Sequence, residues 1–295
     1  MGNSASTPAK RIDTSTVSCY NFQSTNVSER YQYIMQMNEE RVDRFQIQHH
    51  LYREVLKNNF SAPIDDVLKQ GASVLDLGCG PGMWVCEMAT NYRLSLFHGI
   101  DYHNIFPTQK PVNAQFIKAN LLEGLPFKDA SFDYVHLRSM VFCFTPDQWE
   151  HIVINEAIRL LRPNAYIELS EFDVKILNGG PCVTRFSDAL REKLFANKMD
   201  PSIALKLSDI LQQYKSLKNV RRQEIRVNFG RSGGKLGEIQ AELSIRLLRE
   251  DAKLFRGLFK MNAREYDEFV ENYIQELNTH PVYMTWYKFW AQKKN

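Results

Sequence analysis

Short apolar runs alternate with segments of helical periodicity through the middle of this 295-residue chain. The apolar runs cover residues 74–77, 94–100, 114–118, 131–136 and 166–169. Amphipathic segments at about residues 83–90 and 146–161 separate some of these runs. Strands that alternate with helices in this way form a parallel sheet that helices cover on both faces. The pattern therefore predicts an α/β fold.

The region before the first run and the region after the fifth have different patterns. Residues 28–60 place apolar side chains at three- and four-residue steps, which predicts one or two helices. Residues 174–217 are helical in pattern as well. Residues 219–229 alternate between polar and apolar positions and predict a strand with one core face.

The end of the chain adds two helices and a strand to this prediction. Residues 230–235 are rich in glycine and predict a mobile loop. Residues 238–259 predict one long amphipathic helix, and 263–277 predict another that Asn262 caps. Residues 282–290 are apolar on both faces, as in a strand that lies inside a sheet.

The first apolar run continues into a turn with three alternating glycines. Residues 74–82 read Val-Leu-Asp-Leu-Gly-Cys-Gly-Pro-Gly. Gly78, Gly80 and Gly82 permit positive φ and allow a ligand to lie against the backbone. The helix that follows points its free N–H groups at this turn, with Pro81 expected at its first position. A strand, a tight turn and a helix in this order predict a site for a carboxylate or a phosphate.

The spacing of the glycines separates two classes of ligand. The dinucleotide fingerprint G-x-G-x-x-G needs a glycine where this chain has Met83, so the nicotinamide reading is disfavoured. The spacing D-x-G-x-G-x-G, counted from Asp76, resembles motif I of class I S-adenosylmethionine-dependent methyltransferases. A glycine turn in another α/β domain is the alternative. Cys79 is expected to contribute its backbone, although a reactive thiol there is a second reading.

Residues at the ends of the next two runs suit the nucleoside part of such a cofactor. Asp101 closes the second run, and an acid there accepts hydrogen bonds from ribose hydroxyls. Tyr102 follows it and is included in the predicted cofactor site. Asn120 and Leu121 follow the third run and suit the edge and face of adenine. A surface aspartate and an ordinary loop are the alternatives.

Further segments resemble a narrower branch, the fungal LaeA-like and UMTA-type methyltransferases. They are residues 39–51, which include Gln48-His49-His50, and residues 62–64, 132–138 and 166–173. The resemblance implies a Rossmann-like, mostly parallel sheet of seven strands whose last strand is antiparallel. It also implies a regulator of secondary metabolism, acting through protein partners, as an alternative function. Class I members usually have two glycines where this chain has Asn164-Ala165, and Asn tolerates the left-handed conformation that the turn needs.

Composition and periodicity also indicate how the chain is divided. We expect a disordered tail at 1–27, an N-terminal helical segment at 28–70 and an S-adenosylmethionine-binding core at 71–173. Cap helices and the last two strands follow at 174–295.

By the same resemblance the N-terminal helical segment lies over the cofactor. Tyr33, Arg44 and Gln48 would then reach the ligand, with Arg44 as the partner of the methionine carboxylate. A packed helix with a solvated arginine is the alternative for this segment.

Methyl transfer from a sulfonium is an in-line displacement that depends mainly on alignment, and a base helps with some acceptors. His136 and Glu171 are the candidate bases because their strands end at the cleft, although His136 suits a core position as well. Arg138 is expected to bind the cofactor or to fix a loop. The D-P-P-Y type of segment that marks amino-methyltransferases of DNA bases is absent after the fourth run. A small-molecule acceptor is therefore the leading hypothesis.

Composition narrows the remaining possibilities. A net charge of +3 and a pI of about 8.5 do not favour nucleic-acid binding. Five cysteines without a C-x-x-C pair argue against a disulfide framework and against a zinc ribbon, so no metal is expected. Neither a membrane span nor a signal peptide is evident. A cytoplasmic protein is expected, with a nuclear location left open.

The first six residues, Met-Gly-Asn-Ser-Ala-Ser, fit the pattern for N-myristoylation at Gly2. A generic disordered tail is the alternative reading. One myristoyl chain gives only marginal membrane binding, so the pattern predicts reversible membrane association.

Overall fold

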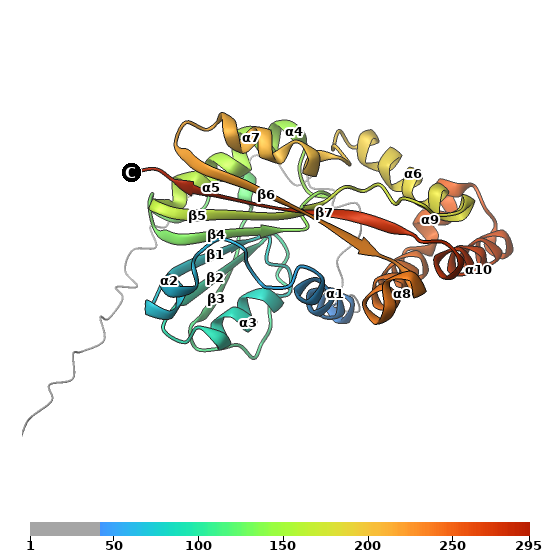
Figure 1. Cartoon of the computed structure of the whole chain (residues 1–295), viewed down its shortest axis with the longest axis horizontal. Coiled ribbons are helices and arrows are strands. Elements are labelled where there is room, and N and C mark those ends of the chain that lie inside the picture. Colours follow the sequence, from blue (N-terminus) through green and yellow to red (C-terminus); the bar gives the residue numbers. More distant parts are fainter. Residues whose placement is uncertain (1–41) are drawn as a thin grey trace, which may run out of the picture.

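The computed structural model describes residues 42–295. One seven-stranded sheet forms its centre, with strand order β3-β2-β1-β4-β5-β7-β6 (Figure 1). The strands are β1 Ser73–Leu77, β2 Leu96–Asp101, β3 Ala114–Lys118, β4 Phe132–Arg138, β5 Leu161–Phe172, β6 Leu217–Asn228 and β7 Tyr283–Lys293. Strands β1 to β5 pair in parallel, and β7 pairs antiparallel with both β5 and β6. The predicted seven-stranded, mostly parallel α/β fold is confirmed.

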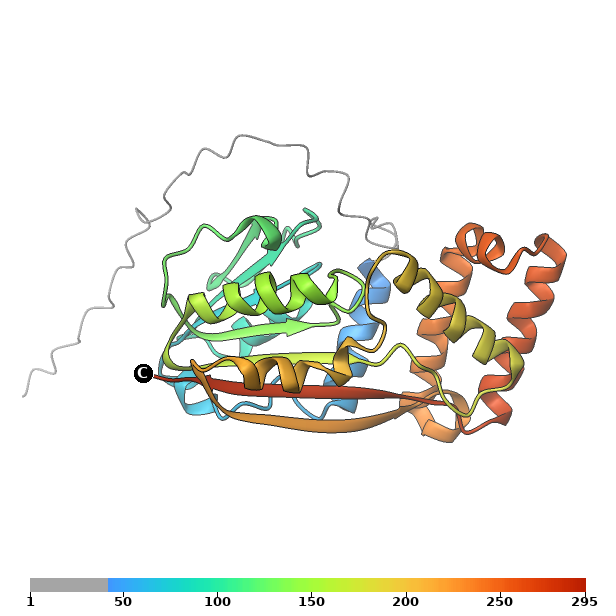
Figure 2. The same cartoon turned by 90° about the horizontal axis from the view of Figure 1, so that it is seen from above.

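Helices cover both faces of the sheet and extend past one end of it (Figures 1 and 2). They are α1 Val42–Val55, α2 Asp65–Gln70, α3 Met83–Asn91, α4 Pro146–Gln148, α5 Ile154–Leu160, α6 Pro181–Ala196, α7 Leu207–Gln213, α8 Gly234–Glu250, α9 Ala252–Phe259 and α10 Ala263–Thr279. A π-helical turn, Trp149–Val153, joins α4 to α5. Both views show α6, α8, α9 and α10 gathered at one end of the molecule, where they form the cap.

Alternation along β1 explains why helices cover both faces. Val74 belongs to the apolar cluster under α2 and α3, whereas Leu75 and Leu77 belong to the cluster that contains the buried residues of α5. All three side chains are buried. A strand that is apolar on both faces must lie inside a sheet with helices on each side.

Several boundaries differ from the sequence prediction. The long helix expected at 238–259 is divided at Asp251 into α8 and α9. The mobile loop expected at 230–235 is a short 3-10 turn followed by the start of α8. Gly230 has φ +62°, and a β-carbon there would lie 2.0 Å from the carbonyl oxygen of Leu277, so this turn is packed against α10.

Other local predictions are confirmed. Asn262 caps α10, because its side chain accepts from the Glu265 backbone and the Glu265 side chain accepts from the Asn262 backbone. Asn164 has φ +63°, as expected for the turn that usually carries glycine. The aromatic side chains of the cap, such as Phe186 and Phe255, are buried in its core, whereas Phe195 is exposed.

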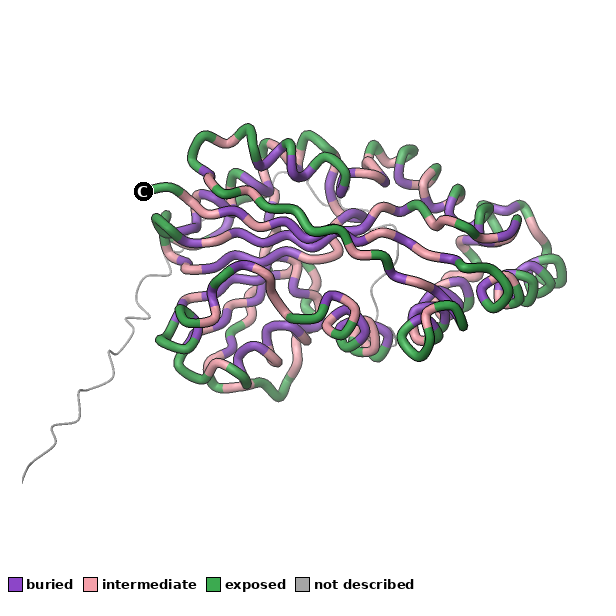
Figure 3. Tube along the Cα trace, viewed as in Figure 1, coloured by how far each residue is buried: buried purple, intermediate pink, exposed green. Residues whose placement is uncertain are grey.

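Strand β6 is mostly exposed, contrary to the expectation of one core face. It lies at the edge of the sheet, where only Leu217 and Val227 are buried. Figure 3 shows this exposed strand crossing in front of the buried central strands. The alternation of the sequence is real. Helices α7 and α8 contact β6, but Val220 and Ile225 are only half-buried against the core.

A buried carboxylate attaches the segment after α1 to the sheet. Glu168 of β5 accepts hydrogen bonds from the backbone N–H groups of Ser61 and Ala62, with N–O distances of 2.8 Å. The Tyr134 hydroxyl donates to the same carboxylate at 3.0 Å, and Lys288 lies 3.9 Å away. These contacts set where α1 ends relative to β5.

In the part of the chain from residue 42 onward, no helix is both long and apolar enough to span a bilayer.

Candidate functional site

A cleft lies at the carboxyl ends of β1, β2 and β4, beneath α1. It encloses about 1260 Å³ of space, part of it open to solvent. The predicted site residues that line it are Asp76, Gly78, Cys79, Gly80, Asp101, Tyr102, Leu121, His136 and Arg138. This is the edge of a parallel sheet at which ligands of α/β proteins bind.

Each glycine of the turn after β1 is needed for a different reason. Gly78, Gly80 and Gly82 all have positive φ, at +73°, +55° and +78°. A β-carbon at Gly78 would lie 2.3 Å from the Met140 sulfur, and one at Gly82 would lie 2.4 Å from the Phe116 ring. A β-carbon at Gly80 would meet nothing within 4 Å. Gly78 and Gly82 therefore permit close packing, whereas Gly80 leaves room for a ligand.

The helix after the turn starts two residues later than a first helical position at Pro81 would require. Gly82 is the N-cap of α3 in a left-handed conformation, so Met83 is the first helical residue. The expectation that Pro81 occupies the first helical position is wrong. Gly82 does not line the cleft, because its α-carbon faces the Phe116 ring.

Asp101 holds the turn in place and keeps some accepting capacity. Its Oδ2 accepts from the Gly80 backbone N–H and its Oδ1 from that of His103, both at 2.8 Å. Each carboxylate oxygen has a second lone pair, so two ribose hydroxyls can still donate to it. Burial raises the pKa of Asp101, and the two backbone donors oppose this shift.

Asn120 does not reach the cleft. Its side-chain oxygen accepts from the Leu122 N–H at 3.0 Å, and its amide nitrogen donates to Glu123 at 2.9 Å. Both halves of the amide are therefore engaged in a helical cap, and only the neighbouring Ala119 and Leu121 line the cleft. The structure does not bring the Asn120 amide to the position predicted for the adenine edge.

The two candidate bases lie in different surroundings. His136 lines the cleft, and its Nδ1 lies 2.8 Å from Asp76 Oδ1. Its ring stacks on Trp84 at 4.1 Å between centroids, with 7° between the planes. With the Asp76 carboxylate as acceptor, Nδ1 carries the proton of the neutral ring. The side chain is therefore both a buried core group and a cleft residue.

Glu171 does not line the cleft. Its carboxylate is buried and accepts from the backbone N–H groups of Met140, at 2.6 Å, and Val141, at 3.1 Å. Burial raises its pKa to about 8, against these two donors. Glu171 thus supports the chain after β4, and the proposed role as a base fails on its position.

The two arginines predicted for the cofactor site lie in different surroundings. Arg44 does not line the cleft; its Nε donates to Glu250 at 2.9 Å and joins α1 to α8. Arg138 does line the cleft, and burial lowers its pKa. No carboxylate within residues 42–295 forms an ion pair with it. Tyr33, the remaining predicted contact, lies outside the described residues.

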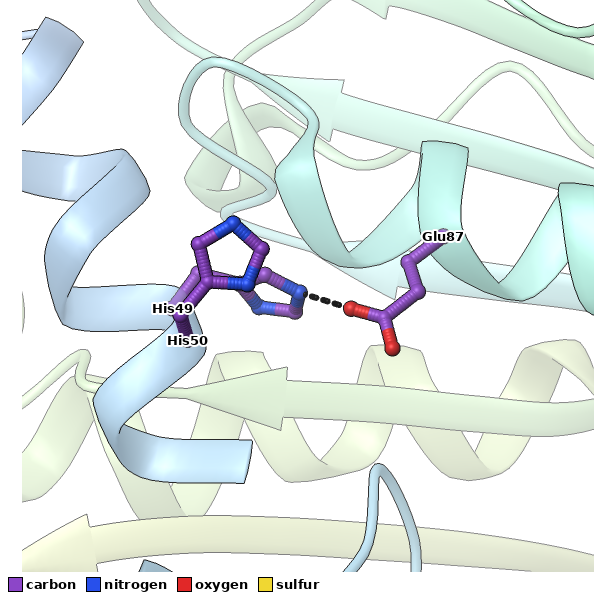
Figure 4. A group of neighbouring side chains, drawn as sticks. All are labelled: His49, His50 and Glu87. Carbon is purple, nitrogen blue, oxygen red and sulfur yellow. Dashed lines mark hydrogen bonds and ion pairs between the residues drawn. The ribbon is translucent and has the colours of Figure 1, made fainter. Parts of the chain in front are cut away.

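His49 links Arg138 to a carboxylate on α3, which the sequence did not reveal. Arg138 Nη2 lies 3.0 Å from His49 Nδ1, and His49 Nε2 lies 2.6 Å from Glu87 (Figure 4). An arginine can only donate, so Nδ1 accepts and Nε2 carries the proton to Glu87. The Gln-His-His segment was the sequence feature that could have indicated His49. Its spacing does not show which of the two imidazoles is buried.

The pKa values of this network follow from its geometry. Burial and the Arg138 charge lower the pKa of His49 to about 4, although Glu87 opposes them. Burial raises the pKa of Glu87, but hydrogen bonds from Arg53, His49 and Asn59 outweigh it and lower the value to about 2. The neutral histidine therefore bridges a cation and an anion.

His49, His50 and Glu87 also place ligand atoms within 4.8 Å of one another, as a metal site would. Both ring nitrogens of His49 are already engaged, and the adjacent guanidinium repels a cation. The arrangement fits a hydrogen-bond network better than a metal site.

Comparison with known proteins agrees with the geometry of the cleft. Residues 74–164 match the family model of a methyltransferase domain. The chain carries an S-adenosylmethionine-dependent methyltransferase domain. This excludes the nicotinamide oxidoreductase, which Met83 already disfavoured.

The methyltransferase str2 of Strobilurus tenacellus is 29% identical over 197 residues, which are 65% of this chain and 70% of that protein. The secondary metabolism regulator LAE1 of Cochliobolus heterostrophus is 26% identical over 145 residues, or 48% of this chain and 47% of that protein. Among solved structures, a phosphoethanolamine N-methyltransferase from Haemonchus contortus has a TM-score of 0.50 and 18% identity. The matching region covers 87% of this chain and 59% of the Haemonchus contortus chain. This similarity shows the fold alone.

The first prediction concerns the space over Gly80. Gly80→Val is expected to weaken binding of S-adenosylhomocysteine at least tenfold, because the new side chain fills space that the fold leaves empty. Isothermal titration calorimetry measures this. Gly124→Val is the control, since Gly124 also has positive φ and open space but lies outside the cleft. Equal affinities for Gly80→Val and the unmodified protein would contradict the assignment.

The second prediction concerns the pH dependence of stability. The pKa of His49 is about 4 in the fold and about 6.5 when unfolded, so between these values the unfolded chain binds the extra proton. The free energy of unfolding should therefore fall on acidification through this window, by on the order of 3 kcal/mol from this residue. Urea unfolding of His49→Gln should show a shallower pH slope. His151→Gln, a change at an exposed histidine, should keep the original pH slope. If the free energy of unfolding depends on pH equally in both variants, the assignment is refuted.

Proposed function

We propose that this methyltransferase transfers the methyl group of S-adenosylmethionine to a small-molecule acceptor. The observation that carries the proposal is the empty space over Gly80, which Asp101 and Arg138 border. A turn without side chains, an acid with spare acceptors and a guanidinium that forms no ion pair with a carboxylate of residues 42–295 match the three parts of the cofactor. These are its sulfonium centre, its ribose and its methionyl carboxylate.

The residues of the cleft divide the binding of the cofactor between them. Asp101 would accept from the ribose hydroxyls, and Leu121 and Tyr102 would contact the nucleoside. Arg138 replaces Arg44 as the proposed partner of the carboxylate, because Arg44 is already paired with Glu250. A guanidinium and a carboxylate form strong, charge-assisted hydrogen bonds.

The chemistry requires little acid–base help. The bound sulfonium supplies an activated methyl group, and the protein must align the acceptor and exclude water. Of the two predicted bases, only His136 lines the cleft, so it remains the candidate for accepting a proton. Glu171 is proposed to position the chain after β4 instead.

A protein acceptor or partner is the second candidate. The similarity to a secondary metabolism regulator supports it. In that case the chain would bind the same cofactor and act as a regulator of secondary metabolism through a protein partner. The resemblance also supports a fungal origin.

The amino-terminal pattern supports two further proposals about location. Gly2 lies outside the described residues, so they rest on the sequence alone. A myristoyl group there would give a lipoprotein that binds membranes reversibly and is otherwise cytoplasmic or nuclear. An unmodified mature N-terminus in mass spectrometry of the native protein would refute acylation.

Turnover is the direct test of the main proposal. With radiolabelled S-adenosylmethionine and a library of metabolites, we expect label in an organic-soluble product and release of S-adenosylhomocysteine. Gly80→Val should abolish both signals. Label that appears only in protein, when a cell extract is supplied, would favour the second candidate over a small-molecule acceptor.

The role of Arg138 has its own test, which compares two ligands. Arg138→Gln should weaken S-adenosylhomocysteine by about tenfold to a hundredfold, because a charge-assisted hydrogen bond is lost. It should change the affinity for 5′-methylthioadenosine, which has no carboxylate, by less than about twofold. Arg44→Gln is the matched control and should change neither affinity. Equal losses for both ligands would show that Arg138 acts only by positioning its neighbours.

A further inference from the structure

A second cavity adjoins the cofactor cleft. It encloses about 890 Å³ between α1, the cap helices α6 and α8, and the chain after β5. Its wall is mainly aromatic and aliphatic, with the rings of Phe142, Phe172, Phe186 and Phe229. We call this second cavity the acceptor chamber.

Four residues border both the cofactor cleft and the acceptor chamber. They are Phe45, Gln48, Tyr52 and Ser139. Ser139 follows β4 directly and has φ +62°, which is unusual for a residue other than glycine. Strain of this kind tends to occur at functional sites. The only wall shared by the two cavities is therefore built on α1 and on the end of β4, as far as the described residues show.

The acceptor chamber contains no unbalanced charge in the described part of its wall. Arg44 is the one lining side chain that is always charged, and Glu250 pairs with it at 2.9 Å. The Tyr52 hydroxyl accepts from Gln48 at 2.9 Å, and burial raises its pKa to about 12. An ionic ligand would lose its hydration here without gaining a counter-charge. The wall thus favours neutral molecules.

Two polar atoms of the wall have no partner. Gln240 is 6% exposed, and its Oε1 is buried without a hydrogen bond. Its Nε2 has only a weak contact, 3.9 Å from the Met284 sulfur. The Ser139 hydroxyl is also buried and unpaired. An unsatisfied buried acceptor destabilises the fold, and a donor on a ligand removes that cost.

From these observations we propose that the acceptor chamber binds the methyl acceptor. The acceptor is a neutral, mainly apolar molecule with rings, and one of its hydroxyl or N–H groups donates to Gln240. This inference rests on the proposed function. A lone pair on an O–H or N–H group of the acceptor at the shared wall forms the new bond to the methyl carbon. The sulfur–carbon bond breaks with its electron pair on sulfur, and the acceptor's proton passes to His136, the candidate base that lines the cofactor cleft.

The experiment uses three naphthalene compounds that differ in one group. Equilibrium dialysis with saturating S-adenosylhomocysteine measures the binding of 2-naphthol, naphthalene and 2-naphthoate to the full chain. We expect 2-naphthol to bind about fivefold more tightly than naphthalene, the value of one net hydrogen bond. The anionic 2-naphthoate should bind at least tenfold more weakly than 2-naphthol.

Gln240→Leu removes the proposed anchor with little change in size. It should reduce the preference for 2-naphthol over naphthalene to less than about twofold and leave naphthalene binding unchanged. Gln223→Leu, the same change at an exposed position on β6, should keep the full preference. The affinity for S-adenosylhomocysteine should be equal in all three proteins.

The outcomes separate this inference from the proposed function. If S-adenosylhomocysteine binds but the uncharged naphthalenes do not, the acceptor chamber is refuted and the cofactor site stands. Preferential binding of 2-naphthoate, or an unchanged preference in Gln240→Leu, also refutes it. If S-adenosylhomocysteine itself does not bind to the unmodified protein, the proposed function fails first.

Discussion

The site depends on the hydrogen bonds that join the turn after β1 to the end of β2. The backbone N–H groups of Gly78 and Cys79 both donate to the Ile100 carbonyl, at 2.8 and 2.9 Å. The Gly80 N–H donates to Asp101 at 2.8 Å. Three successive amides are thus directed at one strand end, which only a chain with positive φ can achieve. The space over Gly80 is therefore formed by the fold itself, before any ligand arrives.

Carboxylates with structural contacts hold the roof of the cleft in place. Glu87 attaches α1 to α3 through His49, and Glu250 attaches α1 to α8 through Arg44. Glu168 holds the segment after α1 on β5, and Glu171 holds the chain after β4. Glu168 and Glu171 are buried, Glu87 is half-buried and Glu250 is exposed. The buried carboxylates have donors nearby, as a carboxylate away from water must. Helix α1 is consequently fixed on several sides above the cofactor cleft.

The two cavities differ in the chemistry that they present. The cofactor cleft has charged groups at its edge, Asp101 and Arg138, which suit a ligand with hydroxyls and a carboxylate. The acceptor chamber has aromatic walls and isolated, unpaired hydrogen-bonding atoms. A methyl transferase needs such a division, because the cofactor is polar and its sulfonium must react away from water. The two cavities meet only at the wall that they share, as far as residues 42–295 show.

The sequence by itself determined the elements that depend on short-range patterns. Alternating strands and helices, the glycine turn, the Asn262 cap and the left-handed Asn164 all follow from neighbouring residues, and the structure has them. Local patterns also placed Asp76 and Asp101 at strand ends, and those ends meet because parallel strands share one edge. These predictions needed no knowledge of distant contacts.

Only the tertiary structure decided which polar side chains face the cleft. Arg44 and Arg138 are equally basic in the sequence, but Glu250 neutralises the first and no described carboxylate pairs with the second. Glu171 is turned away from the cleft because the backbone N–H groups of Met140 and Val141 donate to it. These partners are far apart in the chain or depend on side-chain direction. A pattern of neighbouring residues carries no information about either, because such contacts form only when the layers pack.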